Sequence, residues 1–287
     1  MKVVKIIVCC HKNDIKANIS PYMPIHVGKA ISNQDLGIIG DDEGENISTK
    51  NGSYCELTGM YWAWKNLKNV DIIGLCHYRR YFDFHKQCDS VLPETIYPTS
   101  KFHDIDLSVP TLLTESLNSG TAYVVKPRFY RDSLYTDYCK AHISDDIRSL
   151  EALIMTSQPD NIKESWFNVM HRNCQLHHYN MFVMTWADFD AYCSWLFPIL
   201  SSLESQIDIS HYSTIQRRIW GYMAERLMNV WFVANNFKLK ELPLIWFNDY
   251  PGKSSRSHLK YYRNLFRSKL ALAITRGNYN NFKKSWS

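Results

Sequence analysis

The sequence contains no Cys-x-x-Cys pair, although it has eight cysteines. Zinc-ribbon and thioredoxin-like sites are therefore not supported. Most of the cysteines lie in apolar surroundings, as Cys9 and Cys193 do. We expect free thiols, which are typical of a reducing cytoplasm.

Long apolar runs are also missing. None approaches about 18 residues, the length that indicates a membrane-spanning helix. The chain opens on an apolar segment from Val3 to Cys9, which predicts a strand and not a secretion signal. With no internal repeat and no low-complexity segment, the sequence predicts a globular cytoplasmic protein.

Acidic residues are scarce at the C-terminal end. Residues 249–287 hold nine lysines and arginines against one aspartate, a net +8. The whole chain carries +5, so residues 1–248 carry −3. A mildly acidic body argues against nucleic acid as a partner and favours a basic interaction tail.

The tail has a helical pattern. Apolar residues recur at spacings of three and four, and basic residues occupy other faces. The apolar set is Leu259, Tyr262, Phe266, Leu270 and Ala273, and the basic set is Lys260, Arg263, Arg267 and Arg276. Such a helix favours an anionic membrane surface, with the protein peripheral on the inner face of the plasma membrane. The alternative is a helix that docks on the body or on a partner subunit.

Strand and helix patterns alternate along residues 1–248, which predicts an α/β fold with a mixed, mostly parallel central sheet flanked by helices. We expect this to be one domain, followed by the tail at 249–287. Residues 83–118 read as an irregular insertion with short helices. The expected strands are 2–10, 72–76, 121–125, 179–185 and 239–247, the last an edge strand because it contains a proline. The expected helices are 54–67 (with Ser53 and Glu56 as a capping box), 134–154, 188–203 and 216–232.

The most informative segment joins a buried strand, Ile72 to Cys76, to the polar cluster His77-Tyr78-Arg79-Arg80-Tyr81. Ligands of open α/β sheets bind beyond the carboxyl ends of strands. Guanidinium groups match phosphate oxygens bidentately, so an anionic ligand fits this cluster. An edge strand that runs into a solvated basic turn fits it equally well.

Several longer motifs resemble the DUF4422 family, bacterial glycosyltransferases of capsule, exopolysaccharide and O-antigen assembly. The resemblance runs from about residue 5 to about residue 247. The motifs are Asn46-Ile-Ser-x-x-Asn51-x-x-Tyr54-x-Glu56-Leu-Thr58-x-x-Tyr61-Trp62-x-Trp64-Lys65-Asn66, Ile73-Gly-Leu-x-His77-Tyr-Arg-Arg-Tyr-Phe82, His11-Lys12, Tyr22-x-Pro24-Ile25-x-Val27-Gly28, Asn180-Met181-Phe182 and Arg218-x-x-Gly221-x-x-x-Glu225-Arg226-Leu227.

The resemblance implies a GT-A-like fold that transfers a hexose from a UDP-sugar to a lipid-linked glycan acceptor. Characterised relatives include galactofuranosyltransferases that use UDP-galactofuranose, so we expect inverting transfer of galactofuranose with a beta linkage. A UDP-hexopyranose-dependent galactosyltransferase or glucosyltransferase is the first alternative. A non-catalytic protein that binds nucleotides or glycans is the second.

GT-A enzymes normally hold a divalent metal with Asp-x-Asp after the second main strand. Here that position reads His77-Tyr78-Arg79, and the next carboxylate is Asp83. We therefore expect transfer without a metal or other cofactor, with Arg79 and Arg80 balancing the diphosphate charge. The alternative is that one arginine pairs with an internal carboxylate such as Glu56.

The resemblance and the chemistry together give candidate site residues. The donor-binding candidates are His11, Lys12, Asn46, Ser48, Asn51, Tyr54, Glu56, Thr58, His77, Tyr78, Arg79 and Arg80, and the acceptor-binding candidates are Asn180 and Arg218. Asn46, Ser48 and Asn51 fit sugar hydroxyls, or alternatively Asx-type turns. An inverting transferase needs a carboxylate base, for which Asp145, Asp146, Glu225 and Glu56 are the candidates. The alternative for Glu225 is a structural ion pair.

Overall fold

The computed structural model describes residues 2–88, 91–250, 258–274, 279–284 and 286. Its strands are β1 (Val4–Cys10), β2 (Tyr22–His26), β3 (Ile72–His77), β4 (Arg80–Phe82), β5 (Glu94–Tyr97), β6 (Thr121–Val125), β7 (Arg128–Phe129), β8 (Gln175–Leu176), β9 (Phe182–Thr185), β10 (Lys238–Leu242) and β11 (Leu244–Phe247). Its α-helices are α1 (Asn51–Tyr54), α2 (Leu57–Asn66), α3 (Thr111–Glu115), α4 (Leu134–Ala141), α5 (Ser144–Ser157), α6 (Asp160–Trp166), α7 (Trp186–Glu204), α8 (Ile219–Ala234), α9 (His258–Ile274) and α10 (Tyr279–Lys284).

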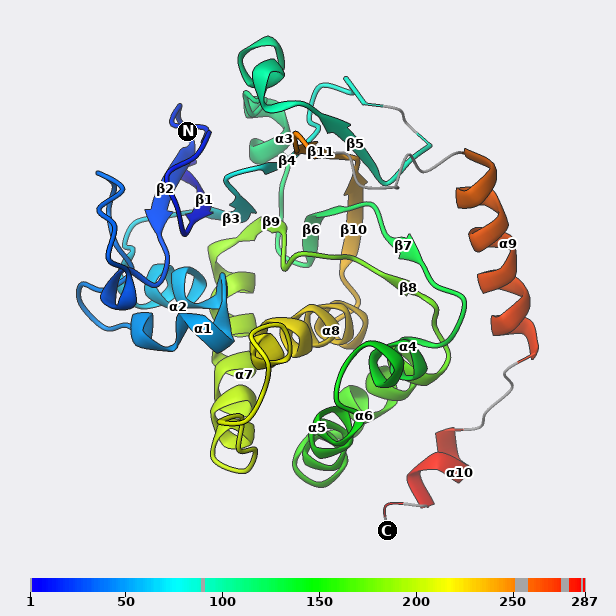
Figure 1. Ribbon diagram of the computed structural model, residues 1–287. Coiled ribbons are helices and arrows are strands. Elements are labelled where there is room, and N and C mark those ends of the chain that lie inside the picture. Colours follow the sequence, from blue (N-terminus) through cyan, green and yellow to red (C-terminus); the bar gives the residue numbers. More distant parts are fainter. Residues whose placement is uncertain (1, 89–90, 251–257, 275–278, 285, 287) are drawn as a thin grey trace.

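Strand β3 lies at the centre of a nine-stranded sheet (Figure 1). It pairs with β1 in parallel and with β9 in antiparallel orientation. Strand β2 continues the sheet beyond β1, and β6 and β10 continue it beyond β9. Strand β4 folds back from β3 and leads to β11 and β5. The parallel ladders contain most of the paired residues, so the expected mixed, mostly parallel sheet is confirmed.

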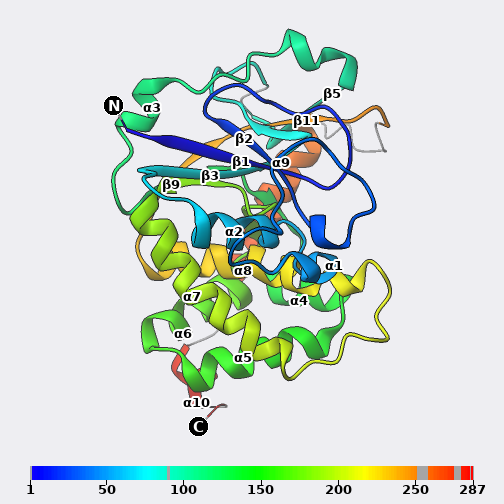
Figure 2. The same ribbon diagram turned by 90° about the vertical axis from the view of Figure 1, so that its left-hand side faces the viewer.

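The sheet has a core on each face, because successive residues of a strand point to opposite sides. In β1, Ile7 and Cys9 pack into the core that includes α2, α7 and α8. Ile6 and Val8 pack into the opposite core, which includes side chains from the insertion at residues 83–118. Figure 2 shows the helices beneath the sheet and this insertion above it.

Three expected elements are divided in the structure. The expected helix at 54–67 is α1 and α2, separated at Cys55, which has a positive φ of 52°. The capping box at Ser53 is wrong, because the Ser53 hydroxyl donates to the Lys50 carbonyl and α2 begins after Glu56. The expected helix at 134–154 is likewise divided into α4 and α5.

Pro243 divides the expected last strand into β10 and β11. Strand β10 pairs with β6 at one edge of the sheet, whereas β11 lies between β4 and β5. A proline lacks the N–H that a continuous ladder needs, so the chain changes partners there. The insertion also contains a strand, β5, that the sequence pattern did not predict.

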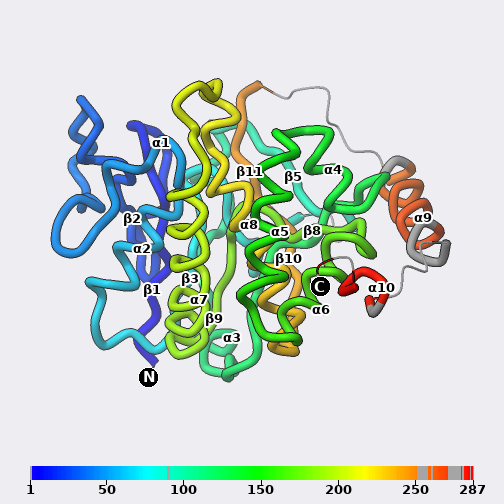
Figure 3. The backbone as a smooth tube through the Cα atoms, turned by 90° about the horizontal axis from the view of Figure 1, so that it is seen from below, coloured from blue at the N-terminus to red at the C-terminus, as the bar shows by residue number. Residues whose placement is uncertain are grey.

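Two helices of the tail lie along one side of the body (Figure 3). The Tyr261 ring of α9 contacts the Phe129 ring of β7, and Lys283 of α10 pairs with Asp160 of α6. Residues 251–257, which join the body to α9, and Arg276 lie outside the described residues, as do the side chains of Lys260 and Ala273.

Candidate functional site

A cavity of about 930 Å³ opens at the carboxyl ends of β1 and β3. His11 follows β1 and His77 ends β3, so parallel pairing brings the two motifs together. This volume lies within the range of about 300–1,000 Å³ that is typical of small-molecule and cofactor sites. Of the predicted residues it brings together His11, Asn51, Glu56, His77, Tyr78, Arg80, Arg218 and Glu225.

Three arginines line the cavity, and one of them, Arg226, pairs with Glu225 at 3.5 Å. The Arg80 guanidinium lies between two aromatic rings, 4.6 Å from the Tyr179 centroid and 5.0 Å from the Trp246 centroid. Arg218 donates through Nε to the Cys55 sulfur at 3.2 Å. Neither Arg80 nor Arg218 forms an ion pair with a carboxylate of the residues that the structure describes. Their charge is thus available to an anion.

His77 adds no charge at neutral pH. Burial and the nearby Arg80 lower the pKa of His77 to about 3. Its Nε2 lies 2.9 Å from the Tyr179 carbonyl oxygen and, since a carbonyl accepts, carries the proton. His77 is therefore a neutral group fixed in one tautomer at the end of β3.

Two carboxylates enter the cavity beside the turn at Tyr179 and Asn180. Glu225 Oε1 accepts from the Tyr179 backbone N–H at 2.8 Å. Glu56 Oε1 accepts from the Asn180 side-chain amide at 2.7 Å. Burial raises the pKa of Glu225 above its ordinary value. The Arg226 guanidinium opposes this shift, and the charge of Glu56 adds to it. A carboxylate with a raised pKa is a better proton acceptor than an ordinary surface carboxylate.

The same turn has an unusual backbone. Tyr179 and Asn180 have φ angles of 71° and 51°, two successive residues in the left-handed region. This conformation costs a non-glycine residue about 1–2 kcal/mol, and strained backbone often marks a functional site. This backbone conformation directs the Tyr179 N–H toward Glu225 and the Asn180 side-chain amide toward Glu56.

Arg79 and Lys12 do not reach the cavity. Arg79 Nη2 lies 2.8 Å from Asp14 Oδ2, and Lys12 Nζ lies 3.5 Å from the same oxygen. The alternative prediction, an internal ion pair, is therefore the one that holds for Arg79, although its partner is Asp14 and not Glu56.

Several other predicted donor residues hold loops together. Asn46 Oδ1 accepts from the Ser48 N–H at 3.1 Å, an Asx-type turn, and the buried Ser48 hydroxyl donates to Asp41. Thr58 accepts from Asn51 at 3.0 Å behind the cavity wall. The Tyr54 hydroxyl donates to Glu204 at 3.1 Å, outside this cavity. Asn180 is buried at 1% exposure and contacts the site through Glu56.

The structure does not bring Asp145 or Asp146 to the cavity. Asp145 pairs with Arg148 on the exposed first turn of α5. Asp146 is buried, and its Oδ1 accepts from the Tyr212 hydroxyl at 2.6 Å. Glu225 and Glu56 are the predicted carboxylates that remain.

The residues near β4 do not fit a metal site of the Asp-x-Asp kind. Asp83 is fully buried, and its carboxylate accepts the N–H groups of Gln87 and Cys88 at 2.9 and 2.6 Å. Within the described part of the chain, no three His, Cys, Asp or Glu side chains come together as a ligand set.

The fold also brings to the cavity residues that were not predicted as site residues, among them Tyr130, Asp137 and His178. The Tyr130 hydroxyl lies 2.6 Å from His178 Nε2, and His178 Nδ1 lies 3.8 Å from Glu225. The polar run His177 to Asn180 before β9 was a usable signal. No sequence pattern indicated Tyr130, which directly follows the two-residue strand β7.

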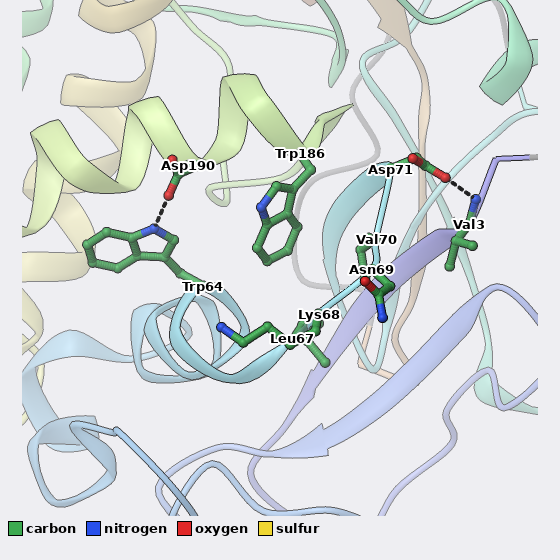
Figure 4. A pocket seen from close by; sticks show the side chains of 9 residues that line it. All are labelled: Val3, Trp64, Leu67, Lys68, Asn69, Val70, Asp71, Trp186 and Asp190. Carbon is green, nitrogen blue, oxygen red and sulfur yellow. Dashed lines mark hydrogen bonds between the residues drawn. The ribbon is translucent and has the colours of Figure 1, made fainter.

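A second cavity, of about 540 Å³, lies at the opposite end of β1 and β3. Figure 4 shows the indole rings of Trp64 and Trp186 at one side and Asp71 at the other. Trp64 donates to Asp190 at 2.7 Å, and Asp71 accepts from the Val3 N–H at 2.7 Å. It shares no residue with the first cavity.

The model of the DUF4422 family, described as a domain of unknown function, matches residues 5–236. The chain belongs to the DUF4422 family. A solved structure resembles this DUF4422 protein with a TM-score of 0.76 and 28% sequence identity: the apo structure of WbbM, a bifunctional glycosyltransferase. The match covers 89% of this chain and 48% of WbbM, so this chain spans about half the length of that protein.

The expected GT-A-like α/β fold of the DUF4422 protein is confirmed by this likeness. No curated protein matches the sequence. None of the helices described here is both long and apolar enough to cross a membrane.

Proposed function

We propose that this DUF4422 protein is a glycosyltransferase that moves a hexose from a UDP-sugar to a glycan acceptor in surface polysaccharide synthesis. One observation carries the proposal: a single cavity joins two arginines without carboxylate partners to two carboxylates held by a strained turn. The likeness to WbbM, itself a glycosyltransferase, supports the same class of reaction.

In the proposed reaction, Arg80 and Arg218 bind the diphosphate of the donor. Negative charge grows on the departing UDP as the bond between the anomeric carbon and the phosphate oxygen breaks. Fixed guanidinium groups stabilise that charge without reorganising. The two rings around Arg80 hold it in place, and the cavity excludes part of the bulk water that would screen it.

Glu225 is the proposed base. It removes the proton from the acceptor hydroxyl as the hydroxyl oxygen attacks the anomeric carbon from the side opposite UDP, which inverts the configuration. Its raised pKa suits it to hold that proton. Glu56 is the second candidate, because its carboxylate lines the same cavity.

The donor we propose is UDP-galactofuranose, with transfer independent of a metal and forming a beta linkage. The first alternative donor is a UDP-hexopyranose. The acceptor we propose is a lipid-linked glycan at the inner leaflet of the plasma membrane, to which the cytoplasmic enzyme binds peripherally. A non-catalytic nucleotide-binding or glycan-binding protein is the competing class.

Donor turnover tests these statements. The protein is incubated with a lipid-linked oligosaccharide and UDP-galactose, with or without a mutase that forms UDP-galactofuranose, and with or without EDTA. Transfer that requires the mutase and survives EDTA is the expected result. Transfer without the mutase assigns a pyranose donor. Activity that EDTA abolishes and Mn²⁺ restores contradicts the arginine mechanism. UDP binding without transfer from any donor, to any acceptor tried, favours the non-catalytic class.

A further inference from the structure

The outward face of α9 is a continuous apolar stripe. Leu259, Tyr262, Phe266 and Leu270 are exposed by 80%, 52%, 68% and 51%. At about 3.6 residues per turn these positions face one side of the helix. Single exposed apolar residues are ordinary, but a contiguous row indicates an interaction surface.

The opposite face of α9 attaches the helix to the body. The Tyr261 ring packs edge-on against Phe129 of β7, with centroids 5.6 Å apart. Ser268 is 2% exposed and forms a side-chain hydrogen bond with Cys174. The helix therefore docks on the body through a face that leaves the apolar stripe outside. Figure 1 shows α9 upright along one side of the sheet, beside β7 and β8.

Basic side chains border the stripe on both sides. Arg263 and Arg267 follow one edge in the helical repeat, and Lys269 follows the other; all three are exposed. Residues 250–287 contain no aspartate or glutamate. An apolar row between cations matches the interface of an anionic bilayer, where side chains enter the acyl boundary and cations meet the headgroups.

We propose that the stripe of α9, formed by Leu259, Tyr262, Phe266 and Leu270, is a docking surface for anionic lipid. The inference deepens the proposed function, on which it rests for the lipid-linked acceptor. Since α9 is packed on β7, the helix would hold the whole body against the bilayer in one orientation. A membrane-bound acceptor would then be presented to an enzyme held at the same surface.

Vesicle sedimentation of the full chain tests the surface. Vesicles are phosphatidylcholine alone or phosphatidylcholine with phosphatidylglycerol. We expect binding only to the anionic vesicles, weakened at least tenfold in Leu259→Ser/Phe266→Ser. We also expect vesicle binding to fall at least tenfold in Arg263→Glu/Arg267→Glu, since basic residues near an anionic surface strengthen binding to it. The matched control is Leu112→Ser on α3, an apolar residue that is 81% exposed away from α9.

Other outcomes overturn the inference. Equal vesicle binding by wild type and the Leu259→Ser/Phe266→Ser variant would exclude insertion of the stripe. Absence of vesicle binding, together with a dimer in sedimentation velocity that this variant abolishes, would assign the stripe to a second copy of the chain. Transfer to a water-soluble acceptor is measured in parallel and should be unchanged in both variants. Vesicle binding without any transfer would contradict the proposed function and leave the lipid surface supported.

Discussion

Asn180 donates its side-chain amide to Glu56 across 2.7 Å, from a backbone in the left-handed region with φ 51°. Its neighbour Tyr179 donates a backbone N–H to Glu225 and accepts a hydrogen bond from His77 through its carbonyl. One two-residue turn thus orients Glu56, Glu225 and the histidine at the end of β3. We regard Tyr179 and Asn180 as positioning residues.

Asn180→Asp tests that role with almost no change of shape. It places a second carboxylate against Glu56, and two such groups in contact cannot both ionise. We expect kcat to fall about 100-fold, the scale of a small misplacement of reacting groups. Steady-state kinetics across pH measures it. The control is Asn236→Asp, which changes another left-handed asparagine away from the cavity and should leave kcat unaltered. Full activity in Asn180→Asp would refute the positioning role.

The two neighbouring arginines should behave differently. Arg80→Ala removes a guanidinium of the cavity, and we expect UDP to bind about 10–100-fold more weakly, given the usual strength of charge-assisted hydrogen bonds. Arg79→Ala removes the partner of Asp14 and should leave UDP affinity within about twofold, since Arg79 does not line the cavity. Isothermal titration calorimetry measures both. Equal losses in the two variants would contradict this assignment.

Glu225→Gln should lower kcat by about 10²–10⁴-fold while UDP affinity stays unchanged, as expected for loss of a general base. Asp146→Asn is the control, because that buried carboxylate lies outside the cavity. If Glu56 is the base instead, Glu56→Gln will lower kcat more than Glu225→Gln does.

The pH dependence of transfer gives a separate test of Glu225. The base must be ionised, so activity falls as pH drops through its pKa. Because burial raises the pKa of Glu225, we expect the acid limb of kcat/KM at a pH above the ordinary glutamate value of about 4.3. The limb should disappear in Glu225→Gln. A limb that persists unchanged there belongs to another group.

His77 should make the fold sensitive to acid. Its pKa is about 3 in the folded protein and about 6.5 when unfolded, so between these values the unfolded chain binds the extra proton. Stability from His77 is fully present above pH 6.5 and is lost as pH falls toward 3. We expect His77→Gln to lose less stability over that window in urea unfolding, with the Gln amide still able to donate to the Tyr179 carbonyl. If the free energy of unfolding falls equally with pH in wild type and in His77→Gln, the lowered pKa of His77 is contradicted.

Much of the fold could be predicted because local patterns agree with the tertiary structure. The strands at β1, β3 and β6 are short, apolar and bounded by polar residues, and α7 and α8 have clear helical periods. The divisions at Cys55 and Pro243 were not foreseen, since each depends on how the chain meets its neighbours in space. Such boundaries are decided by burial and by strand pairing, and neither can be read from a short stretch of sequence.

The sequence by itself determined which chemistry the chain carries: the paired arginines after β3, the glutamates at 56 and 225, the basic tail and the DUF4422 motifs. Only the tertiary structure decided which of these groups meet. Arg79 and Arg80 are adjacent in sequence, yet one pairs with Asp14 and the other lines the cavity, because successive residues leave the backbone in different directions. The apolar row of the tail was visible in the sequence, but its outward direction follows from the contact between α9 and β7.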